Sequence, residues 1–188
     1  MRVTQAVGIG LLGCAAILSA WSGAAAFAPT DDQEVAARLF TDRVERYVRL
    51  RTRLEEPLPP FDLRRDPWSR LLTRRYLASA IRTARAQAKP GDIFGPPVDG
   101  LFREAITRAI YEVDIEGLVD GGAESPIDLM VNEPVPEWAL HDVPRKLLER
   151  LPPLPAALAY RIACGALVLW DEHAEIVIDA LPDAFVTR

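Results

Sequence analysis

Cysteine, histidine and lysine are scarce in this chain, which has two cysteines, two histidines and two lysines among its 188 residues. The H-E-x-x-H and C-x-x-C patterns of common zinc sites are absent. The G-x-S-x-G nucleophile motif, the S-x-x-K motif and a glycine-rich phosphate loop are absent as well. The sequence therefore predicts no metal site and no bound cofactor, and no motif in it selects a catalytic residue.

Charged residues are lacking at the N-terminus, where Arg2 is the only one among the first 30 residues. An apolar stretch runs from Ala6 to Ala20, and small residues at Ala24 and Ala26 supply the A-x-A pattern of a cleavage site. This order is typical of a secretory signal peptide. We therefore expect cleavage after Ala26 and one exported domain over residues 27–188, in the periplasm or outside the cell.

The same segment has two alternative interpretations. Residues 5–28 are long enough to span a bilayer, which takes roughly 20 mainly apolar residues, so an uncleaved segment would anchor the protein. Leu11 to Cys14 also resembles the lipobox of bacterial lipoproteins, in which the cysteine is acylated. Membrane contact is expected only through an uncleaved signal segment or an acylated Cys14.

Acidic residues outnumber basic ones by 27 to 22, and loss of residues 1–26 would make the net charge of −5 more negative by removing Arg2. This balance argues against nucleic-acid binding. Cys164 would then be the sole thiol, which excludes an intramolecular disulfide. Because Cys164 lies in the apolar run from Tyr160 to Trp170, we expect it to be buried.

Three amphipathic helices are expected in the first part of the domain. The first covers Asp31–Glu56, where apolar residues recur every three or four positions and prolines follow. The second begins after Asp66, an N-cap residue followed by proline, and runs to about Lys89. The third covers about Val98 to Val113.

The second helix has no acidic residue and carries many basic ones. Helical geometry places six bases within roughly 140° of one another. These six are Arg70, Arg74, Arg75, Arg82, Arg85 and Lys89. The helix also has an apolar side that we expect to pack against the protein, with Leu72, Tyr76, Leu77 and Ile81. The basic face is a candidate binding surface for an anionic envelope component, such as lipid headgroups or cell-wall polymer, or for an acidic partner protein. Alternatively, its charges pair internally with the acidic later segments.

Acidic residues dominate the stretch from Ala109 to Pro144, which contains nine of them and no basic residue. Five acids alternate with glycines and offer oxygen ligands of the kind that calcium prefers. They are Asp114, Glu116, Asp120, Glu124 and Asp128. Their spacing is not that of an EF-hand, so we expect a solvated loop, with one short strand near Leu129 to Asn132.

The C-terminal part changes to the period of strands. After a short helix over Pro144 to Leu151, strands are expected over Leu158–Ala163, Ala166–Trp170 and Ala174–Asp179. Their short connections require antiparallel pairing. The predicted fold is therefore α+β, with about three amphipathic helices packed on a C-terminal three-stranded antiparallel meander.

Two groups of residues resemble a family of exported bacterial proteins of unknown function. One group is Leu151-Pro152-Pro153-Leu154-Pro155 with Tyr160-Arg161, Leu167 to Asp171 and Ile176 to Asp179. The other is Arg82 to Ala88 with Gly91-Asp92-Ile93-Phe94. The resemblance covers most of the domain and implies export, without any activity or catalytic residue.

We expect a non-enzymatic binding module of the cell envelope. This interpretation would be favoured if the basic face were exposed and flanked by apolar patches. The alternative is a secreted hydrolase that uses carboxylates with His141 or His173, favoured if these histidines and several acids met in one cleft. A nucleophilic pair of Cys164 and His173 across adjoining strands is a further alternative.

Overall fold

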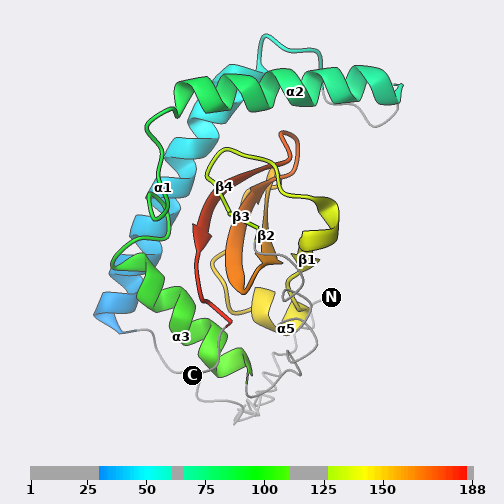
Figure 1. Ribbon diagram of the computed structural model, residues 1–188. Coiled ribbons are helices and arrows are strands. Elements are labelled where there is room, and N and C mark those ends of the chain that lie inside the picture. The colour runs from blue at the N-terminus through cyan, green and yellow to red at the C-terminus, as the bar shows by residue number, and fades with distance from the viewer. Residues whose placement is uncertain (1–29, 61–65, 111–126, 186–188) are drawn as a thin grey trace, which may run out of the picture.

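The computed structural model describes residues 30–60, 66–110 and 127–185 (Figure 1). Within these residues the helices are α1 (Asp31–Glu55), α2 (Pro67–Ala84), α3 (Val98–Ile110) and α5 (Arg145–Leu148), and a 3-10 turn, η2, covers Glu137–Ala139. The strands are β1 (His141–Asp142), β2 (Leu158–Ala163), β3 (Ala166–Asp171) and β4 (Ile176–Leu181). They form one antiparallel sheet in the order β1-β2-β3-β4. The predicted α+β class is confirmed.

The main core lies between the sheet and the two helices α1 and α3. Each helix contributes apolar residues at helical spacing, including Phe40 and Val44 from α1 and Phe102 from α3. The Phe102 ring packs edge-on against Phe40, with 4.8 Å between centroids, and against Phe94 at 5.0 Å. Tyr160 of β2 extends this aromatic group from the sheet. Burial of these rings holds α1 and α3 against one face of the sheet.

A smaller core covers the other face of the sheet. There the segment of residues 127–140 packs Val135 and Ala139 against β3 and β4, which contribute Val168, Trp170 and Val177. Both faces of the sheet are therefore buried, which explains why every residue of β3 and β4 is buried.

The expected strand near Leu129 to Asn132 is not a strand. Asn132 has a positive φ of 66°, and Pro134 follows, so regular pairing stops there. Two backbone hydrogen bonds still tie this segment to β4: Asn132 N–H donates to the Val177 carbonyl at 2.7 Å, and Val177 N–H donates to the Glu133 carbonyl at 2.9 Å. The sheet instead gains the short strand β1, which the sequence analysis missed.

The last predicted strand is displaced. We expected it over Ala174–Asp179, but β4 covers Ile176–Leu181. Asp171 accepts hydrogen bonds from the backbone of His173 and Ala174, at 2.9 and 2.8 Å, and so draws both residues into the turn. The second helix also ends earlier than expected, at Ala84.

Candidate functional site

Helix α2 is rotated relative to the prediction. Its buried positions are Thr73, Leu77 and Ile81, which recur every four residues along one side. Leu72 and Tyr76, expected to pack against the protein, are 37 % and 61 % exposed. The expectation was wrong because the helix wheel gives the spread of apolar residues but not which part of that spread faces the core.

Three of the six predicted binding residues contact acceptors within the protein. Arg74 forms an ion pair with Glu175 at 2.7 Å. Arg82 pairs with Glu133 at 2.8 Å. Arg85 donates to the Asn132 side chain at 2.8 Å and to the Ile178 carbonyl, and its guanidinium lies over the Tyr47 ring.

The other three basic residues differ in their surroundings. Arg75 and Lys89 are exposed. Arg70 is half-buried, and its Nε atom has no hydrogen-bond partner among the described residues. The six residues therefore do not form one uniform exposed face, and their role in binding stays a prediction.

The side of α2 that faces away from the core carries large apolar side chains. Trp68 is 65 % exposed, and it recurs with Leu72 and Tyr76 every four residues. Arg75 and Arg82 are exposed on the same side. We call these five residues the outer face of α2. The N-terminal half of α2 extends past the sheet (Figure 1).

A buried polar network joins α1 to the end of β3. Asp171 is fully buried, and it accepts hydrogen bonds from the Tyr47 hydroxyl at 2.6 Å and from Arg51 Nε at 2.8 Å. Burial, and then the charge of Asp171, raises the pKa of Tyr47 far above its ordinary range. Arg51 also binds Glu55 at 2.7 Å and contacts His173 Nδ1 at 2.6 Å. All polar groups of Asp171 are satisfied within the protein, so this network has a structural role.

His173 belongs to this network. Its Nδ1 lies 2.9 Å from Glu55 Oε1. Desolvation raises the pKa of Glu55, but hydrogen bonds from His173 and Arg51 and the charge of Arg51 outweigh it, so the pKa lies below its ordinary value.

A second buried carboxylate, Asp179, orders the loop between α2 and α3. It accepts hydrogen bonds from the backbone N–H groups of Gly91 at 2.8 Å, Ile93 at 2.7 Å and Phe94 at 2.8 Å. From the other side, Arg43 donates to the carbonyls of Ile93 and Gly95 at 2.8 and 2.7 Å. The sequence analysis missed this function of Asp179, although a carboxylate in an otherwise apolar strand is a signal that could have indicated it.

His141 lies in β1, and His173 lies in the turn between β3 and β4. Cys164 lies in the turn at the other end of β3, so the structure does not bring it together with His173. His141 lines a polar cleft of about 640 Å³ together with acidic residues. The acids are Glu137, Asp142, Glu172 and Glu175. The hydrolase alternative is favoured if both histidines meet several acids in one cleft, and this cleft contains His141 but not His173.

Cys164 is exposed, which corrects the expectation of burial. It forms the two-residue turn between β2 and β3 with Gly165, and the two have positive φ values of 49° and 72°. Turn residues of a hairpin project into solvent whatever the hydropathy of their neighbours.

Within residues 30–60, 66–110 and 127–185, no group of three or more His, Cys, Asp or Glu side chains is arranged to hold a metal ion. Most of the predicted acidic loop, including Asp114, Glu116, Asp120 and Glu124, lies outside the described residues, and so do residues 1–29 with the predicted signal peptide. Asp128 is described and exposed.

Comparisons of the chain with protein-family models, with curated proteins and with solved structures found no match. The resemblance to a family of exported proteins therefore stays a prediction. In the part of the chain that the structure describes, no helix has both the length and the hydropathy that a membrane span requires.

Proposed function

We propose that this protein is an exported, non-enzymatic binding module that docks an acidic partner protein of the cell envelope through the outer face of α2. The observation that carries the proposal is the exposure of Trp68, Leu72 and Tyr76 along one side of a helix. Tryptophan, tyrosine and arginine are the residues that most often dominate the energy of protein interfaces. Arg75 lies beside this stripe and supplies positive charge, and Arg82 lies there paired with Glu133.

Charge complementarity favours an acidic partner. The whole chain has a net charge of −5, but no acidic residue occurs between Asp66 and Asp92. The outer face of α2 is thus a basic and apolar surface on an acidic protein, and its charge would attract an acidic partner. An apolar stripe of three residues suits a groove on a protein better than a lipid surface, which takes a broader apolar face.

Site-specific photo-crosslinking tests this function. A photoreactive residue at Leu72 is expected to crosslink a defined acidic envelope protein in the native host. The matched control is the same residue at Val35, which is 58 % exposed on α1. Equal crosslinking from both positions, or binding of the purified protein to anionic phospholipid vesicles in place of a protein, would contradict the proposal.

The hydrolase alternative retains one supporting observation, the cleft that brings His141 together with four carboxylates. Within it, burial and the charges of Glu137 and Glu172 raise the pKa of Glu175 against the opposing effect of Arg74. A raised carboxyl pKa is a property of general acids. Hydrolysis of a cell-wall polymer that is lost in Glu175→Gln would favour this alternative.

A further inference from the structure

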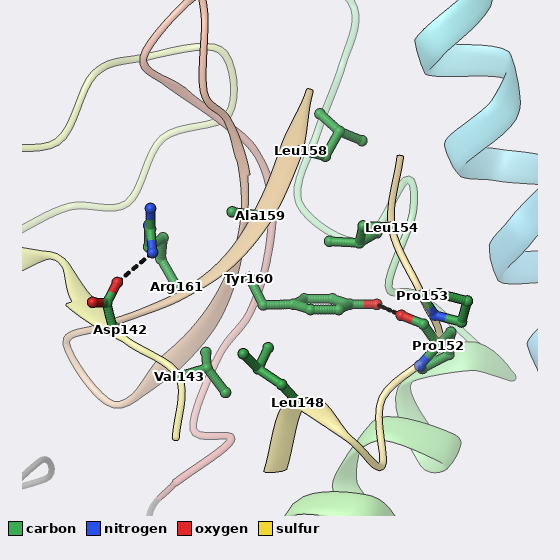
Figure 2. A pocket seen from close by; sticks show the side chains of 10 residues that line it. All are labelled: Asp142, Val143, Leu148, Pro152, Pro153, Leu154, Leu158, Ala159, Tyr160 and Arg161. Atoms are coloured by element: carbon green, nitrogen blue, oxygen red, sulfur yellow. Dashed lines mark hydrogen bonds and ion pairs between the residues drawn. The ribbon is translucent and has the colours of Figure 1, made fainter. Parts of the chain in front are cut away.

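Two hollows meet at the edge of the sheet, and none of the residues of the outer face of α2 lines either of them. The first, of about 440 Å³, is mainly apolar. Figure 2 shows the Tyr160 side chain crossing from β2 toward the Pro152–Leu154 segment, where its hydroxyl donates to the Pro152 carbonyl at 2.9 Å. Leu148 and Leu158 complete the apolar walls. We call this space the apolar hollow.

The second hollow is the polar cleft of about 640 Å³ that contains His141, here called the acidic hollow. Two of its carboxylates neutralise Arg161 and one neutralises Arg74, so both bases are already paired. Glu137 is exposed and has no ion-pair partner among the described residues. The acidic hollow therefore keeps a net negative charge, and it attracts a cation.

One ion pair separates the two hollows. Asp142 of β1 and Arg161 of β2 are cross-strand partners and form an ion pair. Both residues line both hollows. The pair is visible in Figure 2 at the side of the apolar hollow. A ligand that occupied both hollows would therefore pass over Asp142 and Arg161, with one group on each side.

We propose that these two hollows bind an extended peptide segment in which a leucine-sized apolar residue is followed by a lysine or arginine. Neighbouring side chains of an extended peptide project to opposite sides of its backbone. One can therefore enter the apolar hollow while the next places its cation beside Glu137 and Glu175. Each hollow is in the size range of ligand pockets in proteins. Arg74 of α2 lines the acidic hollow, but no residue of the outer face of α2 lines either hollow, so this site is distinct from the surface proposed for the acidic partner.

Short capped peptides test the proposal on the full chain. The probe is acetyl-Ala-Leu-Lys-Ala-amide, and two matched peptides replace the lysine by glutamate or the leucine by alanine. Isothermal titration calorimetry is expected to give at least tenfold weaker binding for the glutamate peptide and about threefold weaker binding for the alanine peptide. Equal affinities for the lysine and glutamate peptides, or no binding at millimolar concentration, would overturn the proposal.

Two exposed positions separate the contributions of the hollows. Glu137→Gln is expected to weaken the lysine peptide about fivefold and to leave the glutamate peptide unchanged or bound more tightly. Leu148→Ser is expected to remove the preference for leucine over alanine. Leu148 is 42 % exposed and Glu137 is also exposed, so both variants should fold. The control is Glu45→Gln, an exposed glutamate on α1 outside both linings, and a loss of binding in this control equal to that in Glu137→Gln would also overturn the proposal.

Discussion

The Tyr47 hydroxyl donates a hydrogen bond of 2.6 Å to the Asp171 carboxylate across 124 residues of sequence. The bond joins the middle of α1 to the last residue of β3, next to the turn that begins β4. Because Arg51 binds the same carboxylate oxygen, α1 is fixed to the sheet by two donors at once. Both donors and the acceptor are buried, so water cannot replace a lost partner without a cost in free energy.

We expect Asp171→Ala to be strongly destabilising and Tyr47→Phe to be mild. Loss of the carboxylate leaves the buried Arg51 guanidinium with a single acidic partner and should lower the free energy of unfolding by about 3–5 kcal/mol. Loss of the hydroxyl alone should cost about 1 kcal/mol. Urea denaturation measures both, with Asp42→Ala on the exposed side of α1 as the control. Asp171→Ala as stable as this control would show that the network has no structural role.

Asp179→Asn should loosen the loop between α2 and α3. The amide nitrogen cannot accept the N–H groups that one carboxylate oxygen now holds, so we expect a loss of about 2–4 kcal/mol. Hydrogen exchange should show faster exchange of the amides of Ile93 and Phe94, which bind this carboxylate. Asp183→Asn, at an exposed residue beyond β4, is the control. Unchanged protection of both amides would contradict the assignment.

The sequence predicted the helices and the C-terminal strands well, because their signals are local. Thr30 caps α1 with a capping box and Asp66 caps α2, and both helices begin where the caps place them. The two-residue link at Cys164 gave the antiparallel pairing of β2 and β3. The displaced start of β4 depends on Asp171 binding the backbone of the following turn, which is a contact of one side chain and not a property of strand periodicity.

Glu55 should make stability depend on pH in the acid range. Its pKa in the folded protein lies below the ordinary value of 4.5, so its contribution is fully present above that value and is lost as the pH falls through the lower, folded-state pKa. Glu55→Gln should therefore reduce the dependence of the urea midpoint on pH as the pH falls below the ordinary value of 4.5. An unchanged dependence in Glu55→Gln would show that its ion pairs with Arg51 and His173 do not contribute.

Cys164 should be both reactive and unfavourable for the turn. As an exposed thiol it should be modified by a thiol reagent in the folded protein, without denaturant. Its φ of 49° disfavours most L-residues but suits asparagine before glycine, so Cys164→Asn should raise the free energy of unfolding by about 0.5–1 kcal/mol. Cys164→Ser keeps the unfavourable conformation and serves as the control. A thiol that reacts only in denaturant would contradict its exposure.

The candidate site was only partly predictable from the sequence. The absence of acids along α2 indicated an unusual helix, and the acidic segments that pair with it, at Glu133 and Glu175, were recognised as possible partners. The exposure of Trp68 and Tyr76 was not predicted. It depends on which side of α2 contacts β4 and the loop at residues 132–133, and that contact is tertiary. Burial of Leu77 and Ile81 in the core, together with the tertiary contacts of Arg85 and Arg82, fixes that orientation.

The affinity of the crosslinked acidic partner for α2 variants tests the central claim most directly. Trp68, Leu72 and Tyr76 are exposed, so Trp68→Ser and Tyr76→Ser should change the free energy of unfolding by no more than about 0.5 kcal/mol. Each should nevertheless weaken binding by about thirtyfold, the effect of losing an interface residue worth about 2 kcal/mol, and Arg75→Glu should weaken it further at low salt. The matched control Val35→Ser should bind as the unaltered protein does. Equal affinity of Trp68→Ser, Tyr76→Ser and the unaltered protein would contradict the account.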